Sequence, residues 1–201
     1  LVGLLTLMSY NPAVGVHYAL LLIPVAFISV LVHELAHAGM IGALGFGSSQ
    51  IILGGMGGVT INQRRARPWQ NFLISVAGPL SSFALMYLAG LAQRTTLGQT
   101  DNMLRAFLPF MVVANLWWGI FNLLPVPPLD GGHATRDLFR MLTSERTAFI
   151  ISIWIAIVVG GAVAVFLFVK GSLLGAFYLA WFVYMAFQQW QYFRQHGIPG
   201  D

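Results

Sequence analysis

Five long apolar runs, separated by short segments rich in glycine, proline or charge, make up most of this chain. Each run has at least the length of about 18 apolar residues that indicates a membrane-spanning helix. We count a shorter apolar stretch at residues 1–8 as a partial N-terminal span. The pattern predicts an all-α polytopic membrane protein with about five full transmembrane helices and a six-helix core. The runs cover Val16–Ala43, Trp69–Gln93, Arg105–Leu124, Ala148–Val169 and Leu173–Tyr192.

The segment 44–68 interrupts the helical pattern with a glycine cluster between two β-branched stretches. That arrangement predicts a small membrane-associated β-hairpin, because non-helical backbone at membrane depth is tolerated where it lies in protein or lines a cavity. The edge of a hairpin can pair with an extended substrate strand. A lipid-surface turn without a function is the alternative interpretation. The candidate substrate-binding glycines are Gly54, Gly55, Gly57 and Gly58.

The segment 125–146 opens with three prolines in four positions and carries an isolated acidic residue. The prolines exclude a helix at that point and predict an extended or turned backbone. Asp130 is the only charged residue between Arg105 and Arg136, so it should have a partner. We interpret the rest of the segment as a cytosolic loop. The whole of residues 1–201 is expected to form one transmembrane domain.

Composition agrees with a membrane protein and excludes several other classes. The chain is 58% hydrophobic and 8% charged, with a mean hydropathy of +0.77, which a soluble domain of this size would not carry. The net charge of +4 does not indicate nucleic-acid binding, because lysine and arginine lie in the loops between runs. Cysteine is absent, which excludes disulfides and thiolate metal sites.

A His-Glu-x-x-His unit, formed by His33, Glu34 and His37, lies inside the first long run. On a helix the two histidines lie on one face, one turn apart, and can reach one metal ion. This is the spacing of a metalloprotease zinc site, in which the glutamate takes a proton from the water on the metal.

This unit is unlikely to arise by coincidence, since the composition of the chain predicts it about 0.001 times. Glu34 is also the only charged residue between Leu1 and Gln63. A charge at the centre of a bilayer costs about 2.5–3.5 kcal/mol on insertion scales, so such a residue needs a partner or a function. Two histidines and a glutamate that satisfy one another between packed helices are the structural alternative.

The distribution of basic residues predicts the orientation of the spans. Seven basic residues lie in the loops and tail on one side, and three lie on the other. The positive-inside rule places the seven in the cytosol, so the active site is predicted on the cytosolic side of a cell membrane. His33–His37 and Asp130 then arrive on the same side. The seven are Arg64, Arg65, Arg67, Arg136, Arg140, Arg146 and Arg194, and the three are Arg94, Arg105 and Lys170.

A catalytic zinc site takes three protein ligands and keeps a fourth position open. His33, His37 and Asp130 complete such a set for one zinc ion, with Glu34 as the general base in peptide hydrolysis. Asn122 is a candidate donor to the substrate backbone or the oxyanion, and an interhelical hydrogen bond is equally consistent with the sequence. His133 is a candidate to hydrogen-bond one of the metal ligands, although a solvated loop histidine fits its position better.

The His33–His37 unit, followed downstream by Asn122-Leu-Leu-Pro125-Val-Pro127-Pro-Leu129-Asp130-Gly131-Gly132, resembles the site-2 protease family of intramembrane metalloproteases. The glycine-rich hairpin and the Ala77-Gly78-Pro79 span extend the resemblance over most of the chain. We expect a short core form without a PDZ or CBS domain.

The resemblance implies a zinc endopeptidase with the two histidines and the aspartate as ligands, the glutamate as base and Asn122 near the substrate. It implies cleavage of transmembrane segments of membrane-anchored regulators, in a lipid bilayer and with regulatory membrane partners. The sequence identifies neither the substrate nor the oligomeric state. A membrane metal transporter, or a metal-gated binding protein with the same ligands, is the alternative from a different class. Transport gives no reason for a glutamate beside the ion.

Overall fold

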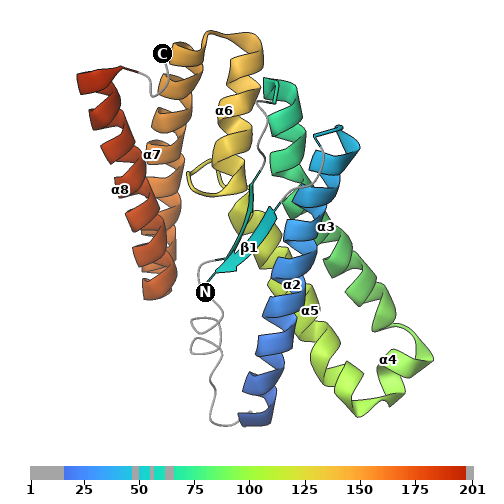
Figure 1. Cartoon of the computed structure of the whole chain (residues 1–201). Coiled ribbons are helices and arrows are strands. Elements are labelled where there is room, and N and C mark those ends of the chain that lie inside the picture. The colour runs from blue at the N-terminus through green and yellow to red at the C-terminus, as the bar shows by residue number, and fades with distance from the viewer. Residues whose placement is uncertain (1–15, 47–49, 55–56, 62–65, 198–201) are drawn as a thin grey trace. The chain divides into compact units, whose positions relative to one another are not determined.

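The computed structural model describes residues 16–46, 50–54, 57–61 and 66–197 (Figure 1). The partial span expected at residues 1–8 lies outside these ranges. Apart from one two-stranded hairpin, every regular element in these ranges is a helix. The helices are α2 (Val16–Ala43), α3 (Pro68–Ala92), α4 (Thr96–Thr100), α5 (Asn102–Asn122), α6 (Asp130–Leu142), α7 (Glu145–Val169) and α8 (Leu173–His196).

Polar side chains fix several of the helix starts. The Thr95 side chain accepts a hydrogen bond from the backbone N–H of Gly98 at the start of α4. The Ser144 side chain accepts one from Thr147 at the start of α7. Such caps satisfy backbone donors that a helix leaves without an intrahelical partner. At α4 and α7, a polar side chain just before the helix therefore helps to define where the helix begins.

Four helices are long and apolar enough to cross a membrane: Leu21–Ala43, Pro68–Ala92, Asn102–Asn122 and Glu145–Val169. The fifth predicted run does form a helix, α8, but α8 is not among these four. Its C-terminal half contains glutamines, an arginine and a histidine among its aromatic residues, and these lower its mean hydropathy. An all-helical membrane fold is thus supported by four spans within the described residues.

The segment 125–146 differs from its prediction as a loop. Residues 123–129 are turned, with hydrogen bonds from Val126 N to Leu124 O (2.7 Å) and from Leu129 N to Val126 O (2.9 Å). The arginine-rich remainder, however, is the 13-residue helix α6. Glycine has low helix propensity, so Gly131 and Gly132 favoured the prediction of a loop where the structure has a helix.

Packing explains why these two glycines lie at the start of α6. A Cβ on Gly131 would lie 2.2 Å from the backbone oxygen of Leu123, and one on Gly132 would lie 2.5 Å from the backbone nitrogen of Pro127. Both distances are shorter than any van der Waals contact. The first turn of α6 therefore packs directly on the backbone of the preceding turn.

A two-stranded antiparallel hairpin lies between α2 and α3. It consists of β1 (Gln50–Gly54) and β2 (Gly57–Ile61), with Gly54 opposite Gly57 and Gln50 opposite Ile61. Both strands lie beside α2 (Figure 1). Gly58 lies opposite Leu53, whereas Gly55 falls outside the described residues.

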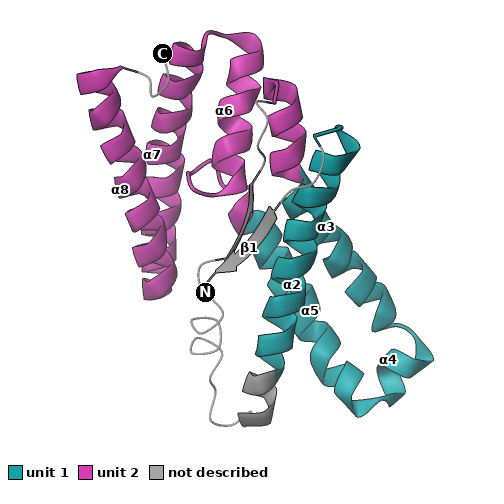
Figure 2. Cartoon of the chain, viewed as in Figure 1, with its two compact units in different colours: residues 1–65, 77–120 teal, residues 66–76, 121–201 magenta. Residues whose placement is uncertain are grey.

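The chain divides into two compact units, residues 1–65 with 77–120 and residues 66–76 with 121–201 (Figure 2). The expectation of one domain over residues 1–201 stays a prediction. In unit 1, a core cluster joins α2, α3 and α5 through Val25, Ala89, Leu108 and Met111. These residues are at most 9% exposed, so the three helices exclude water at their shared contact.

Unit 2 is built on the antiparallel pair α7 and α8, which lie side by side in Figure 1. Its core includes Val126, Ile153 and Leu179. Ala156, Gly160 and Ala164, which lie at four-residue spacing along α7, are all buried. This small-residue face allows the side chain of Val183 on α8 and that of Val126 to approach the α7 backbone.

Gly160 and Gly161 provide a matched test of this packing. A Cβ on Gly160 would lie 2.6 Å from Val183 Cγ2, whereas one on Gly161 meets nothing within 4 Å. Gly160→Ala should therefore lower the free energy of unfolding by about 1–3 kcal/mol relative to Gly161→Ala. Thermal unfolding in detergent micelles measures the difference. Equal midpoints for the two variants would contradict close contact at Gly160.

Candidate metal centre

Helix α2 places three ionisable side chains in a buried environment. His33, Glu34 and His37 are 3%, 5% and 7% exposed. Their helical spacing puts the two imidazole rings one turn apart, with centroids 4.8 Å apart and planes inclined by 79°. The predicted pairing of the histidines on one helix face is thus present within unit 1.

The Nε2 atoms of both imidazoles face the same point on α3. A Cβ placed on Gly78 would lie 2.5 Å from His33 Nε2 and 2.3 Å from His37 Nε2. Two ring nitrogens at this spacing can supply two ligands to one metal ion. Imidazole nitrogen suits zinc, as it does copper, iron and nickel.

Helix α3, which carries Gly78, also contacts the other ring nitrogen of His33. His33 Nδ1 lies 3.1 Å from the hydroxyl oxygen of Ser82, which is 1% exposed. Metal-ligating histidines usually hydrogen-bond through the nitrogen that does not bind the metal, and this contact orients the ring. His33 has such a contact in Ser82.

A second polar contact joins α2 to α5 one turn before His33. Asn115 Nδ2 donates to Ser29 Oγ (2.9 Å) and to the Met111 backbone oxygen (2.9 Å), and Asn115 is fully buried. The ring of Trp118 on α5 also lies edge-on to His33, with centroids 6.2 Å apart. Helix α5 thus supports the histidine face of α2 by hydrogen bonding and by aromatic packing.

Asp130 is the first residue of α6 and is half-buried. It follows the turn at residues 123–129 directly, and the close packing of Gly131 and Gly132 on that turn fixes where the helix starts. A carboxylate in the first turn of a helix is stabilised by the helix dipole. Asp130 is therefore held at a defined position within unit 2.

The remaining predicted site residues are distributed over three elements. Asn122 is half-buried and ends α5, and His133 is exposed on α6. Gly54, Gly57 and Gly58 lie at the end of the hairpin where the strands connect. Their roles toward a substrate stay predictions.

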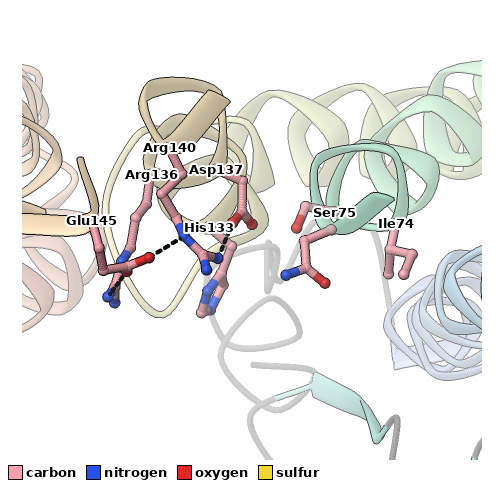
Figure 3. Close-up of a pocket in the computed structure, with 8 residues that line it drawn as sticks. Ile74, Ser75, His133, Arg136, Asp137, Arg140 and Glu145 are labelled. Carbon is pink, nitrogen blue, oxygen red and sulfur yellow. Dashed lines mark hydrogen bonds and ion pairs between the residues drawn. The ribbon is translucent and has the colours of Figure 1, made fainter. Parts of the chain in front are cut away.

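Unit 2 also contains a polar cavity of about 380 Å³ that sequence analysis did not identify (Figure 3). Figure 3 shows Ser75 and Ile74 on α3 beside the charged residues of α6 and Glu145. His133 lines this cavity, which gives it a polar environment within α6. The lining residues are Asn71, Ile74, Ser75, His133, Arg136, Asp137, Arg140 and Glu145.

An ion-pair network forms the charged wall of the cavity. Glu145 accepts hydrogen bonds from Arg136 Nη2 at 2.7 Å and from Arg140 Nε at 2.5 Å, while Arg140 Nη1 also donates to Asp137 at 2.7 Å. Burial raises the pKa of Asp137, although the hydrogen bond from Arg140 opposes this shift. The network connects the C-terminal half of α6 to the first residue of α7.

Gly78 and Ser82 were recognised in the sequence only as small residues that allow helices to approach. Their contacts with the histidines were missed, because residue spacing along one helix does not specify which residues of another helix face it. The sequence did carry one signal for these contacts. A hydroxyl residue lies beside an Ala-Gly-Pro unit, in the span that follows the His-Glu-x-x-His unit.

Comparison with known proteins identifies the family. The model of the family described as Peptidase M50B-like matches residues 4–127, and that of Peptidase family M50 matches residues 90–167. The chain belongs to the M50 peptidases. The resemblance to the site-2 protease family that the two motifs indicated is thereby confirmed, and with its four apolar helices this M50 chain is a multi-pass membrane protein.

Two relatives show how far the similarity extends. Rip3 of Mycobacterium tuberculosis, provisionally named a zinc metalloprotease, is 34% identical over 171 residues, which cover 79% of this chain and 42% of Rip3. A zinc metalloprotease of Methanocaldococcus jannaschii is 30% identical over 148 residues, covering 73% of this chain and 41% of the relative. This M50 chain therefore spans about two fifths of the length of these curated relatives.

The fold of this M50 chain also resembles a solved structure. The site-2 protease from Methanocaldococcus jannaschii superposes with a TM-score of 0.63, at 22% sequence identity, over 100% of this chain and 86% of that chain. At this identity the likeness concerns the fold.

The ion-pair network of this M50 chain predicts a loss of stability when Glu145 loses its charge. Glu145→Gln leaves two partly buried guanidinium groups without their shared carboxylate, and should lower the free energy of unfolding by about 1–2 kcal/mol. Glu145→Asp keeps the charge and should lose less. Chemical unfolding in detergent micelles compares the variants. A wild-type value for Glu145→Gln would show that the network contributes nothing to stability.

Proposed function

We propose that this chain is an intramembrane zinc endopeptidase, which hydrolyses peptide bonds within or near transmembrane segments of membrane-anchored regulatory proteins. The observation that carries the proposal is the convergence of the His33 and His37 Nε2 atoms beside Gly78, on a buried helix face next to Glu34. Membership of the M50 peptidases supports the same chemistry. Such an activity would act in regulated intramembrane proteolysis, in which cleavage within the membrane releases a membrane-anchored regulator.

The proposed zinc ligands are His33, His37 and Asp130, with one ion bound. Two imidazoles and a carboxylate form a donor set typical of catalytic zinc, which keeps a fourth position open. Both histidines are buried and Asp130 is half-buried. When bound, zinc polarises a carbonyl oxygen and allows a water molecule to lose a proton near neutral pH.

Glu34 is the proposed general base. It follows His33 directly on α2, so its carboxylate flanks the face on which the two imidazoles lie. In this role it accepts the proton of the attacking water and transfers it to the amine nitrogen of the leaving peptide. Asn122 has two proposed roles that remain open: a donor to the substrate backbone or an interhelical hydrogen bond.

A membrane-spanning substrate must be unwound before hydrolysis, because the hydrogen bonds of a helix shield its peptide groups. We propose that the β1–β2 hairpin lies at the membrane and presents an edge to which an extended substrate segment pairs, near Gly54, Gly57 and Gly58. Antiparallel pairing of Gln50–Gly54 with Gly57–Ile61 supports this role. Gly55 is included from its position in the sequence.

The proposed topology has five full spans and a cytosolic active site in the cell membrane. Helix α8 is 24 residues long, or about 36 Å, and packs along the apolar α7. That length suffices to cross a bilayer with the aromatic residues near one interface. The excess of arginine on one side of the predicted spans supports the cytosolic placement.

The ligand set predicts which substitutions remove zinc. His33→Ala, His37→Ala and Asp130→Ala should each reduce bound zinc well below one ion per chain, measured by elemental analysis of the purified protein. His196→Ala, at the exposed end of α8, is the matched control and should retain a full ion. Full zinc content in Asp130→Ala would exclude the aspartate from the site.

The role of Glu34 predicts that Glu34→Gln loses cleavage but keeps zinc. Loss of a general base should reduce the rate of peptide cleavage by about 10²–10⁴-fold. A transmembrane substrate reconstituted with the enzyme in liposomes provides the assay, and Leu35→Ala, at an exposed position of α2, is the control. Unchanged cleavage would refute the mechanism. Zinc flux across the liposome membrane that survives Glu34→Gln would instead favour a transporter.

A further inference from the structure

Ser82 contacts Nδ1 of His33, which fits one tautomer of the imidazole. The Ser82 hydroxyl donates to the backbone oxygen of Gly78 at 3.3 Å, and its oxygen lies 3.1 Å from His33 Nδ1. When the Ser82 proton is directed at Gly78, the Ser82 oxygen accepts from His33, and Nδ1 then carries the hydrogen. The lone pair of the imidazole is then on Nε2.

The orientation of the His33 ring agrees with this tautomer, because Nδ1 faces Ser82 and Nε2 faces Gly78. His33 Nε2 is the atom that would lie 2.5 Å from a Cβ on Gly78, and His37 Nε2 converges on the same point. Both Nε2 atoms therefore lie close to the backbone of α3 at Gly78. Any side chain at this position would overlap and displace both nitrogens.

We propose that helix α3 supplies the second layer of the zinc site, with Ser82 as the positioning residue that holds His33 as an Nε2 ligand and Gly78 as the residue that lets the α3 backbone approach both Nε2 atoms without displacing them. The inference rests on the proposed zinc chemistry and extends it to residues of another helix. Ser82 does not touch the substrate in this assignment. It acts only through His33.

Helix α3 contains a matched control for each position. Ser81 donates a hydrogen bond to the same Gly78 oxygen, at 2.7 Å, so Ser81→Ala removes an equivalent hydroxyl next to Ser82. Gly90 lies on the same helix, and a Cβ there meets nothing within 4 Å. Gly90→Ala thus adds the same methyl group as Gly78→Ala without the contact.

The experiment uses the full chain, purified in detergent and stripped of metal. Zinc affinity is measured by competition with a chromophoric chelator, and cobalt is added separately to record the visible absorption bands that report ligand geometry. Ser82→Ala should weaken zinc binding by about 10–100-fold, as loss of a second-shell contact typically does, and should shift the cobalt bands. Ser82→Thr, which restores a hydroxyl, should recover both, and Ser81→Ala should resemble the wild type.

Gly78→Ala should lose zinc binding, whereas Gly90→Ala should keep it. The added Cβ overlaps two buried imidazoles, so the metal-free Gly78→Ala protein should unfold at a lower temperature than the Gly90→Ala protein, as expected for a crowded helix contact. A metal-free Gly78→Ala protein that still unfolds cooperatively but has no zinc affinity would separate a lost site from a misfolded chain. Normal zinc affinity in Gly78→Ala would overturn its assignment.

The assignment of Ser82 fails if Ser82→Ala binds zinc and cobalt like the wild type, or if Ser82→Thr is as weak as Ser82→Ala. Such a result, obtained while Glu34→Gln still abolishes cleavage, would leave the proposed function intact. If the wild-type chain itself binds no zinc, both the function and the inference are overturned.

Discussion

The cost of burying polar groups among apolar helices is the constraint on which the structure depends. His33, Glu34 and His37 are at most 7% exposed, in a stretch of more than sixty residues that carries no other charge. A buried polar group without a hydrogen bond costs about 2–7 kcal/mol, depending on the reference state. The neighbouring helices must therefore carry hydrogen-bonding side chains at the positions that face these buried groups. Ser82 on α3 and the Asn115–Ser29 contact between α5 and α2 meet this requirement.

Small residues serve two different purposes in this chain. At Gly160 the missing side chain makes room for Val183 and Val126, and the result is packing. At Gly78 the neighbours are the nitrogens of two imidazoles, and the result is close contact between potential ligands and a helix backbone. The same amino acid at a helix contact thus supports either stability or chemistry. The side chains that face it decide which.

The sequence predicted most of the helices, because their apolar length is a property of each segment alone. Helix α2 was expected at Val16–Ala43 and has those bounds, and α3 and α7 differ by at most three residues. Helix α6 was missed, since Gly131, Gly132 and the preceding prolines indicate a loop, and only close packing on residues 123–127 explains the glycines. The contact between Ser82 and His33 could not be predicted from the sequence either, because it depends on how α2 and α3 are rotated about their axes relative to each other.

Two kinds of interaction hold helix α6 at its opposite ends. At its first turn, Gly131 and Gly132 pack on backbone atoms, which defines where Asp130 begins the helix. Further along, Arg136 and Arg140 bind Glu145 at the start of α7, and Arg140 also binds Asp137. Steric contact is short-ranged and insensitive to salt, whereas partly exposed ion pairs weaken as ionic strength rises. With 13 residues, or about 20 Å, between its ends, α6 is short enough to behave as one rigid piece. The position of the acidic residue proposed as a ligand therefore depends first on the glycine contact, and the ion pairs join the later turns of α6 to the start of α7.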